Sequence, residues 1–258
     1  MAKEAKKESK PKEKELTGRI HSFESFGGVD GKGIRYVVFV QGCPVGCIFC
    51  HNVDTWKMDG GNLCTVSEVM KKIENCKPYL QLSNGGVTVS GGEPLSQAKF
   101  VAELFKRCKK TGINTAIDTS GCGSKEDIDA VSKHLDMFLV SVKHPTEEGH
   151  RKLTTKSRDE LWNNIRYIDS KGLPMWIRFV VIPGVTDKEE VLKGVGEFIK
   201  SLKNVRRVEL IPYHTLGVNK WKELGMKYAL DGVPPADEKV MEKAAVTVRK
   251  YFSNVVVV

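Results

Sequence analysis

The sequence predicts an α/β fold with parallel strands, arranged as a partial (β/α)6 barrel of the TIM type in a single domain. Six short apolar segments alternate with helical segments, which is typical of parallel strands joined by helical crossovers. The polar and glycine-rich clusters follow the carboxyl ends of these segments, where a barrel carries its functional residues. An open doubly wound sheet also fits the alternation, but the placement of the clusters favours the barrel. The chain's 258 residues suffice for one large core.

The strands are expected where apolar and β-branched residues concentrate in short runs. A first strand is expected at residues 17–23, followed by a glycine-rich turn at residues 27–33. The six main strands are expected at residues 34–40, 86–89, 114–117, 137–142, 175–182 and 205–211. The apolar end of the chain, residues 254–258, predicts one more short strand.

The helices are expected between the strands, with recognisable start and stop signals. Thr111 and Gly112 end the helix that follows the second main strand, and an acidic first turn opens the next helix. Helices are expected at residues 97–110, 125–134, 146–153, 159–170, 188–202 and 236–252. Residues 1–16 predict a disordered charged tail, and residues 17–258 a single domain with a C-terminal helical extension.

Composition narrows the class of protein. The chain has no run of 18 apolar residues, and its first 15 residues lack the apolar segment of a signal peptide. Seven cysteines form no secreted disulfide pattern, which predicts a cytoplasmic protein. The net charge of +9 is compatible with a solvated surface, an acidic protein partner or nucleic acid. No basic run is interleaved with aromatic residues, so no nucleic-acid partner and no membrane association are expected.

Three cysteines stand close together after the first main strand. Cys43, Cys47 and Cys50 are spaced four and three positions apart on one short loop. A structural zinc ion usually has four ligands, and His51 directly follows Cys50, so it is poorly placed as the fourth. Three thiolates suit a [4Fe–4S] cluster with one iron left open to a small molecule. The zinc site remains the alternative at this point.

The spacing Cys43-x3-Cys47-x2-Cys50, with an aromatic residue at Phe49, resembles the signature of the radical S-adenosylmethionine (SAM) enzymes. The resemblance implies that the open iron of a [4Fe–4S] cluster binds the methionine end of SAM. An electron from the cluster then cleaves the sulfonium C–S bond and gives a 5′-deoxyadenosyl radical. It also implies a partial barrel of the radical SAM type.

Longer segments resemble the glycyl-radical activating enzymes, in particular those that act on pyruvate formate-lyase. The similarity covers roughly residues 17–250 and includes residues 18–25, 31–43, 50–52, 54–56, 176–184 and 210–214. It implies an oxidoreductase that removes a hydrogen atom from a glycine of pyruvate formate-lyase. Flavodoxin or ferredoxin is the implied electron donor. We also expect a monomer.

The resemblance also assigns roles to individual residues. Cys43, Cys47 and Cys50 are the implied metal ligands and catalytic group. The implied SAM contacts are Phe49, Cys50, His51, Gly91, Gly92, Glu93, Lys143 and His214. Asp30 and Arg35 are expected to shape the entrance for the partner's glycine loop. Without the resemblance, Gly91–Glu93 is a strand-to-helix turn, Lys143 a surface charge, His214 a structural histidine, and Asp30–Arg35 a turn with a solvated arginine.

Two positions depart from the family pattern. Ser141 stands where relatives have an aspartate that helps to bind a monovalent cation. Asp118 and Thr119 remain, so a cation near Asp118 is expected with reduced charge at its site. Thr155 stands where relatives usually have glycine.

Two rival functions are weighed. An activase for another glycyl-radical enzyme often carries an inserted cysteine-rich segment, whereas residues 52–84 contain only Cys64 and Cys76. A zinc-dependent nucleic-acid-binding module is favoured only by the basic charge.

Overall fold

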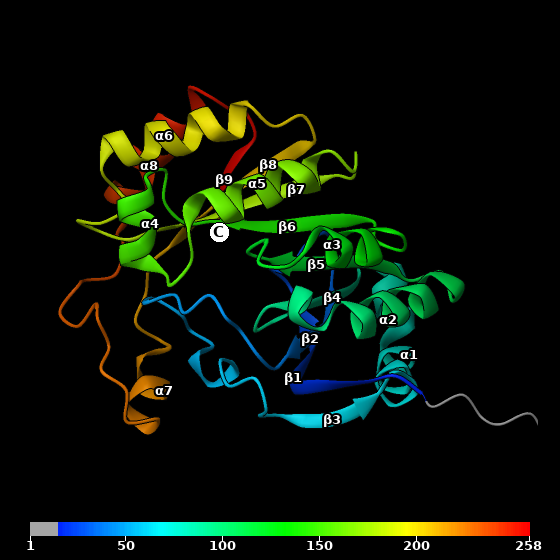
Figure 1. Cartoon of the computed structure of the whole chain (residues 1–258). Helices are drawn as coiled ribbons and strands as arrows, with labels where there is room; N and C mark the ends of the chain where they lie inside the picture. Colours follow the sequence, from blue (N-terminus) through cyan, green and yellow to red (C-terminus); the bar gives the residue numbers. More distant parts are fainter. Residues whose placement is uncertain (1–14) are drawn as a thin grey trace, which may run out of the picture.

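The computed structural model describes residues 15–258, and the strands in this range form one sheet. The strand order is β3-β1-β2-β4-β5-β6-β7-β8-β9, which Figure 1 shows from the cyan and blue edge to the red edge. The strands are β1 (Thr17–Gly27), β2 (Arg35–Val40), β3 (Asn62–Thr65), β4 (Gly86–Gly91), β5 (Asn114–Thr119), β6 (Met137–Val142), β7 (Met175–Val181), β8 (Val205–Pro212) and β9 (Val255–Val257).

Helices follow most of the parallel strands. The α-helices are α1 (Val66–Leu82), α2 (Ala98–Lys110), α3 (Lys125–Ser132), α4 (Glu147–Leu153), α5 (Arg158–Asp169), α6 (Glu189–Lys200), α7 (Val218–Glu223) and α8 (Glu238–Arg249). Two short 3-10 helices are η1 (Val53–Thr55) and η2 (Pro94–Gln97).

The topology of the sheet confirms the partial barrel. Strands β2, β4, β5, β6, β7 and β8 are parallel and lie side by side in chain order. A doubly wound sheet would reverse its strand order at a switch point, and this one does not. Within residues 15–258 the edge strands β3 and β9 do not pair with each other, so the barrel is open. The antiparallel strands β1 and β3 extend one edge, and β9 extends the other.

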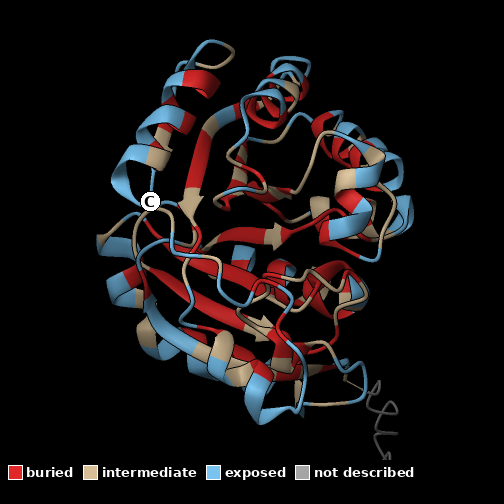
Figure 2. Cartoon of the chain, turned by 90° about the vertical axis from the view of Figure 1, so that its left-hand side faces the viewer, coloured by how far each residue is buried: buried red, intermediate tan, exposed pale blue. Residues whose placement is uncertain are grey.

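The two faces of the sheet differ in polarity because successive side chains on a strand point to opposite faces. One face is apolar, with residues such as Val38, Val140 and Phe179 in the main core under the helices. The opposite face carries buried or nearly buried polar groups, including Thr88 and Glu209. Figure 2 shows the buried strands in red at the centre, with exposed helix surfaces around them. The candidate site lies at the carboxyl end of this polar face.

One strand and two α-helices of the structure are absent from the sequence-based expectation: β3, α1 and α7. Helix α1 begins at a capping box, in which the Thr65 side chain accepts from the Glu68 amide and Glu68 accepts from the Thr65 amide. Pro78 lies inside this helix. Within residues 15–258, none of the helices is both long and apolar enough to cross a membrane.

The predicted tail reaches residue 16, and most of it lies outside the described residues. The two residues that are described, Glu15 and Leu16, are attached to the fold. A Glu15 carboxylate oxygen accepts hydrogen bonds from the Ser67 amide at 2.9 Å and from Arg107 at 2.9 Å. The Leu16 carbonyl accepts from the Val66 amide at 3.1 Å.

Candidate functional site

The three cysteines lie on the loop that leaves the carboxyl end of β2. Backbone hydrogen bonds fold this loop against η1 and the residue after it. The Gly42 amide donates to the Thr55 carbonyl at 2.7 Å, and the Cys43 amide to the Trp56 carbonyl at 3.2 Å. The Cys50 carbonyl accepts from the Trp221 indole at 2.9 Å, so α7 lies against the same loop.

The loop after β4 lies directly against the cysteine loop, which explains its two glycines. Gly91 has φ +102°, and a Cβ there would lie 2.6 Å from the Val40 nitrogen. A Cβ on Gly92 would lie 2.3 Å from the Gly42 carbonyl oxygen. The Gly92 amide donates to the Val40 carbonyl at 2.8 Å. Both positions therefore require glycine, because backbone meets backbone here.

One cavity of about 150 Å³ joins most of the predicted site residues. The ends of four neighbouring strands, β2, β4, β5 and β6, supply its walls. Its lining residues are Cys43, Val45, Cys47, Cys50, Asn52, Thr55, Ser90, Gly91, Gly92, Glu93, Asp118, Thr119, Ser120, Ser141 and Lys143. All three cysteines and both members of the Gly91–Gly92 pair thus face the same space as Glu93 and Lys143.

The cysteine thiols are partly or largely buried, and burial governs their acidity. It raises the pKa of Cys43 to about 12 and that of Cys50 to about 11, and it also raises the pKa of Cys47. The charge of Lys143 opposes the shift at Cys47 and Cys50. These thiols need a strongly cationic ligand to bind as thiolates.

The donor set fits an iron–sulfur cluster. Thiolates are the usual protein ligands of such clusters, and the cavity lies directly beside them. In the part of the chain that the structure describes, no three histidine, cysteine, aspartate or glutamate side chains are grouped as ligands of a single metal ion.

Glu93 is fully buried and is held by donors from its own surroundings. Its carboxylate accepts from the Thr119 hydroxyl at 2.5 Å, the Ser120 hydroxyl at 2.5 Å, the Ser120 amide at 2.9 Å and the Leu95 amide at 3.1 Å. Burial raises the pKa of Glu93, and these donors oppose the rise. The structure therefore shows a tie between the loops after β4 and β5.

Two predicted histidines form a pair beside the cavity. The rings of His51 and His214 lie 4.1 Å apart between centroids, and His51 Nε2 lies 3.0 Å from the His214 carbonyl oxygen. Burial, and next the charge of His214, lower the pKa of His51. Phe49 is buried, and its ring centroid lies 5.4 Å from Lys143 Nζ.

Arg35 does not lie at an entrance, contrary to the expectation. Its side chain is fully buried at the amino end of β2, away from the cysteines. It donates to Thr88 at 2.9 Å, to Asn114 at 2.8 Å and to the Val87 carbonyl at 2.5 Å. These bonds tie β2 to β4 and β5, so the role of Arg35 is structural. Local sequence could not show this, because its partners come from other strands.

Asp30 belongs to a charged group on the polar face of the sheet that sequence reasoning missed. The centre of this group is Arg178, which lies 2.9 Å from Asp118, 3.3 Å from Glu209 and 3.9 Å from Asp30. Burial and the charge of Asp118 raise the pKa of Asp30 to about 6. The available signals were Arg178, the one charged residue in the otherwise apolar strand β7, and Glu209, which stands between two apolar residues in β8.

Asp118, the residue expected to bind a monovalent cation, already has side-chain partners. One Asp118 oxygen accepts from Arg178 at 2.9 Å and from the Ser90 hydroxyl at 3.1 Å. The Thr119 hydroxyl donates to Glu93. Ser141 lines the same cavity and pairs with Arg178 in the register of β6 and β7. The positive charge next to Asp118 is therefore that of the Arg178 guanidinium.

Comparisons with known proteins agree with this geometry. The sequence model of the Radical SAM superfamily matches residues 37–193. A pyruvate formate-lyase-activating enzyme of Staphylococcus epidermidis is 45% identical over 236 residues, covering 89% of this chain and 94% of the relative. A pyruvate formate-lyase 1-activating enzyme of Escherichia coli is 41% identical over 242 residues, covering 93% and 98%.

Solved structures show the same architecture. A domain of a pyruvate-formate lyase-activating enzyme from Bacteroides vulgatus superposes with a TM-score of 0.57 at 27% identity, covering 67% of this chain and 99% of that one. A radical SAM methyltransferase from Sphaerobacter thermophilus gives a TM-score of 0.65 at 17% identity, covering 89% and 70%, which is a likeness of fold alone.

Proposed function

The chain belongs to the radical SAM superfamily and, within it, to the pyruvate formate-lyase-activating enzymes, and on this premise we propose that it installs a glycyl radical on pyruvate formate-lyase. The observation that carries the proposal is the single cavity shared by Cys43, Cys47, Cys50, the Gly91–Gly92 pair and Lys143. Members of the superfamily use a [4Fe–4S] cluster and SAM, and this cavity offers thiols for the first and polar groups for the second.

The three thiols would hold the cluster as thiolates, leaving one iron without a protein ligand. When bound, the cluster would supply the electron that cleaves SAM, and the resulting 5′-deoxyadenosyl radical would take a hydrogen atom from the partner's glycine. The protein contributes binding, orientation and electrostatics. Lys143 places a positive charge beside the cavity, where it favours the carboxylate of SAM and the anionic cluster.

The remaining SAM contacts follow from position. The His51–His214 pair and Phe49 offer flat surfaces beside the cavity, suited to the adenosine end of SAM. Glu93 acts mainly by fixing the Ser120 loop, since its carboxylate already has four donors. Arg178 takes the place of a monovalent cation beside Asp118, which makes the enzyme independent of potassium.

The electron donor is an acidic protein such as flavodoxin or ferredoxin. The net charge of +9 favours encounter with such a partner.

The proposal is tested by anaerobic purification followed by assay. We expect a brown protein with about four irons that, with a reductant, converts SAM to 5′-deoxyadenosine. Addition of pyruvate formate-lyase should consume one SAM for each glycyl radical formed. A colourless protein with one zinc ion and no SAM cleavage would refute the proposal.

A further inference from the structure

The cysteine loop rests on a second segment of the chain, the turn between α4 and α5. Three backbone groups of the loop are bound by this turn. The Ile48 amide donates to the Leu153 carbonyl at 3.0 Å, and the Val45 carbonyl accepts from the Thr155 amide at 2.9 Å. The Thr155 hydroxyl lies 3.1 Å from the Pro44 carbonyl oxygen and 3.0 Å from the Val45 carbonyl oxygen, and its single proton is shared between them. These contacts lie on both sides of Cys47.

The side chain of Thr155 also fits the loop sterically. Gly46 has φ +61°, and a Cβ on it would lie 2.8 Å from the Thr155 γ-methyl carbon. The methyl group of Thr155 therefore covers the glycine that turns the loop between Cys43 and Cys47, while its hydroxyl holds the two carbonyls before that glycine. Both branches of one side chain thus contact the same half of the loop.

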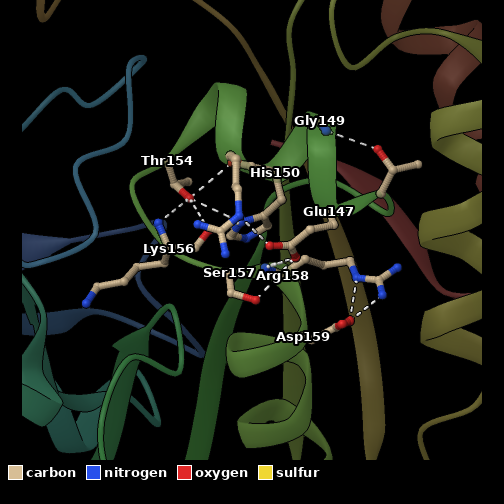
Figure 3. A network of polar contacts seen from close by, with 10 residues as sticks. Glu147, Gly149, His150, Thr154, Lys156, Ser157, Arg158 and Asp159 are labelled. Carbon is tan, nitrogen blue, oxygen red and sulfur yellow. Dashed lines mark hydrogen bonds and ion pairs between the residues drawn. The ribbon is translucent and has the colours of Figure 1, made fainter.

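The turn that carries Thr155 is held by hydrogen bonds to His150 of α4. The buried ring of His150 has its Nδ1 2.9 Å from the Lys156 carbonyl oxygen. The Thr154 hydroxyl donates to the His150 carbonyl at 3.1 Å. Figure 3 shows His150 at the centre of this network, with Thr154 and Lys156 to its left. The residues on either side of Thr155 are therefore both fixed to His150.

The turn is also tied to α5 and to the end of β6. The Glu147 carboxylate accepts from the Arg158 amide at 2.8 Å and from the Ser157 hydroxyl at 3.2 Å (Figure 3). The Arg158 guanidinium donates to the Pro145 carbonyl at 2.7 Å. These bonds connect the start of α4, the start of α5 and the segment after β6. The support under Thr155 is thus part of the folded framework.

We propose that Thr155 is a positioning residue for the cysteine loop, and that its hydroxyl holds the half of the loop between Cys43 and Cys47 in the shape that receives the iron–sulfur cluster. The inference rests on the proposed function for the identity of the bound group. Its claim about the loop rests only on the contacts above. Since Thr155 itself is exposed, its substitution leaves the core intact.

The test compares Thr155→Ala with Thr155→Ser, because both variants lose the methyl group and only the first loses the hydroxyl. Thr111→Ala is the matched control, since the Thr111 hydroxyl also donates to backbone carbonyls, those of Arg107 and Cys108 at the end of α2. Two quantities are measured under anaerobic conditions. They are deuterium uptake by the peptide 43–50, and the rate at which an iron chelator removes iron from the loaded protein.

Thr155→Ala should raise deuterium uptake in peptide 43–50 and speed iron loss by about two- to tenfold, the range that corresponds to the net contribution of one hydrogen bond. Thr155→Ser should stay closer to the parent protein than Thr155→Ala, and Thr111→Ala should change neither quantity. Equal uptake and equal iron loss in the Ala and Ser variants would overturn the role of the hydroxyl. A parent protein that binds no iron would refute the proposed function, and deuterium uptake would still decide the role of Thr155.

Discussion

Replacing Glu93 distinguishes two roles that this residue could have. It hydrogen-bonds to the loop after β5 within the fold, and it was expected to contact SAM. The Glu93→Ala variant removes the acceptor of four hydrogen bonds in a buried environment. Two of the donors are hydroxyls, which can rotate toward other acceptors. The other two are the backbone amides of Leu95 and Ser120, which cannot turn away.

The expected cost follows from these two amides. An unsatisfied buried donor costs about 1–3 kcal/mol, and water entering from the adjacent cavity recovers part of it. Glu93→Ala should therefore lower the free energy of unfolding by about 2–4 kcal/mol. Glu93→Gln keeps one carbonyl oxygen as an acceptor, so its loss should be about half as large.

The assays are urea unfolding of the protein, iron content after anaerobic reconstitution, and calorimetric titration with SAM. We expect Glu93→Ala to retain its iron, because the cysteine loop keeps its own backbone contacts, and to bind SAM more weakly. An unfolding free energy within about 0.5 kcal/mol of the parent would refute the role of Glu93 as an internal tie.

Three further predictions concern the ligands, the cation and the polar face. Replacing Cys43, Cys47 or Cys50 by alanine should abolish SAM cleavage and lower the iron content. Full activity in one of these variants would exclude that cysteine as a ligand. Ser141→Asp should introduce a dependence of activity on potassium, because Arg178 already faces the carboxylates of Asp30, Asp118 and Glu209, and one more exceeds what it neutralises; equal rates with and without potassium would contradict this account. Asp30→Asn should flatten the decline of stability between pH 4 and pH 6. The pKa of Asp30 is about 6 in the folded parent and 3.8 in the unfolded chain, so the folded state holds the proton more tightly. The free energy of unfolding of the parent should therefore fall by up to about 3 kcal/mol as the pH rises from 4 to 6. Unfolding curves with the same slope in parent and variant would show that Asp30 is already ionised at pH 4.

The strands were predictable because each is a short apolar run of the right length. The expected segments at residues 34–40 and 137–142 correspond to β2 and β6, and the same holds for the other main strands. Helix α1 was harder to recognise because Pro78 interrupts its pattern, although the capping box at Thr65 and Glu68 was a usable signal. The local pattern of apolar residues therefore predicts regular strands and helices, and it fails for elements whose pattern is interrupted.

The site was predictable in part, for a physical reason. The cysteines and the Gly91–Gly92 pair belong to contiguous motifs, and the cavity brings them together. Arg35 and Glu93 behave differently because their partners come from distant strands and loops. Asn114 and Thr88 surround the guanidinium of Arg35, while Ser120 binds Glu93. Local sequence does not reveal whether a charged group is satisfied within the fold.

The central claim is that this chain generates a radical on a glycine of pyruvate formate-lyase. The most direct measurement is EPR spectroscopy of an anaerobic mixture of the reconstituted protein, SAM, a reductant and pyruvate formate-lyase. We expect an organic radical signal on pyruvate formate-lyase that is absent when SAM is omitted and absent with the Cys50→Ala variant. Formation of 5′-deoxyadenosine without any protein radical on pyruvate formate-lyase would contradict the assigned partner.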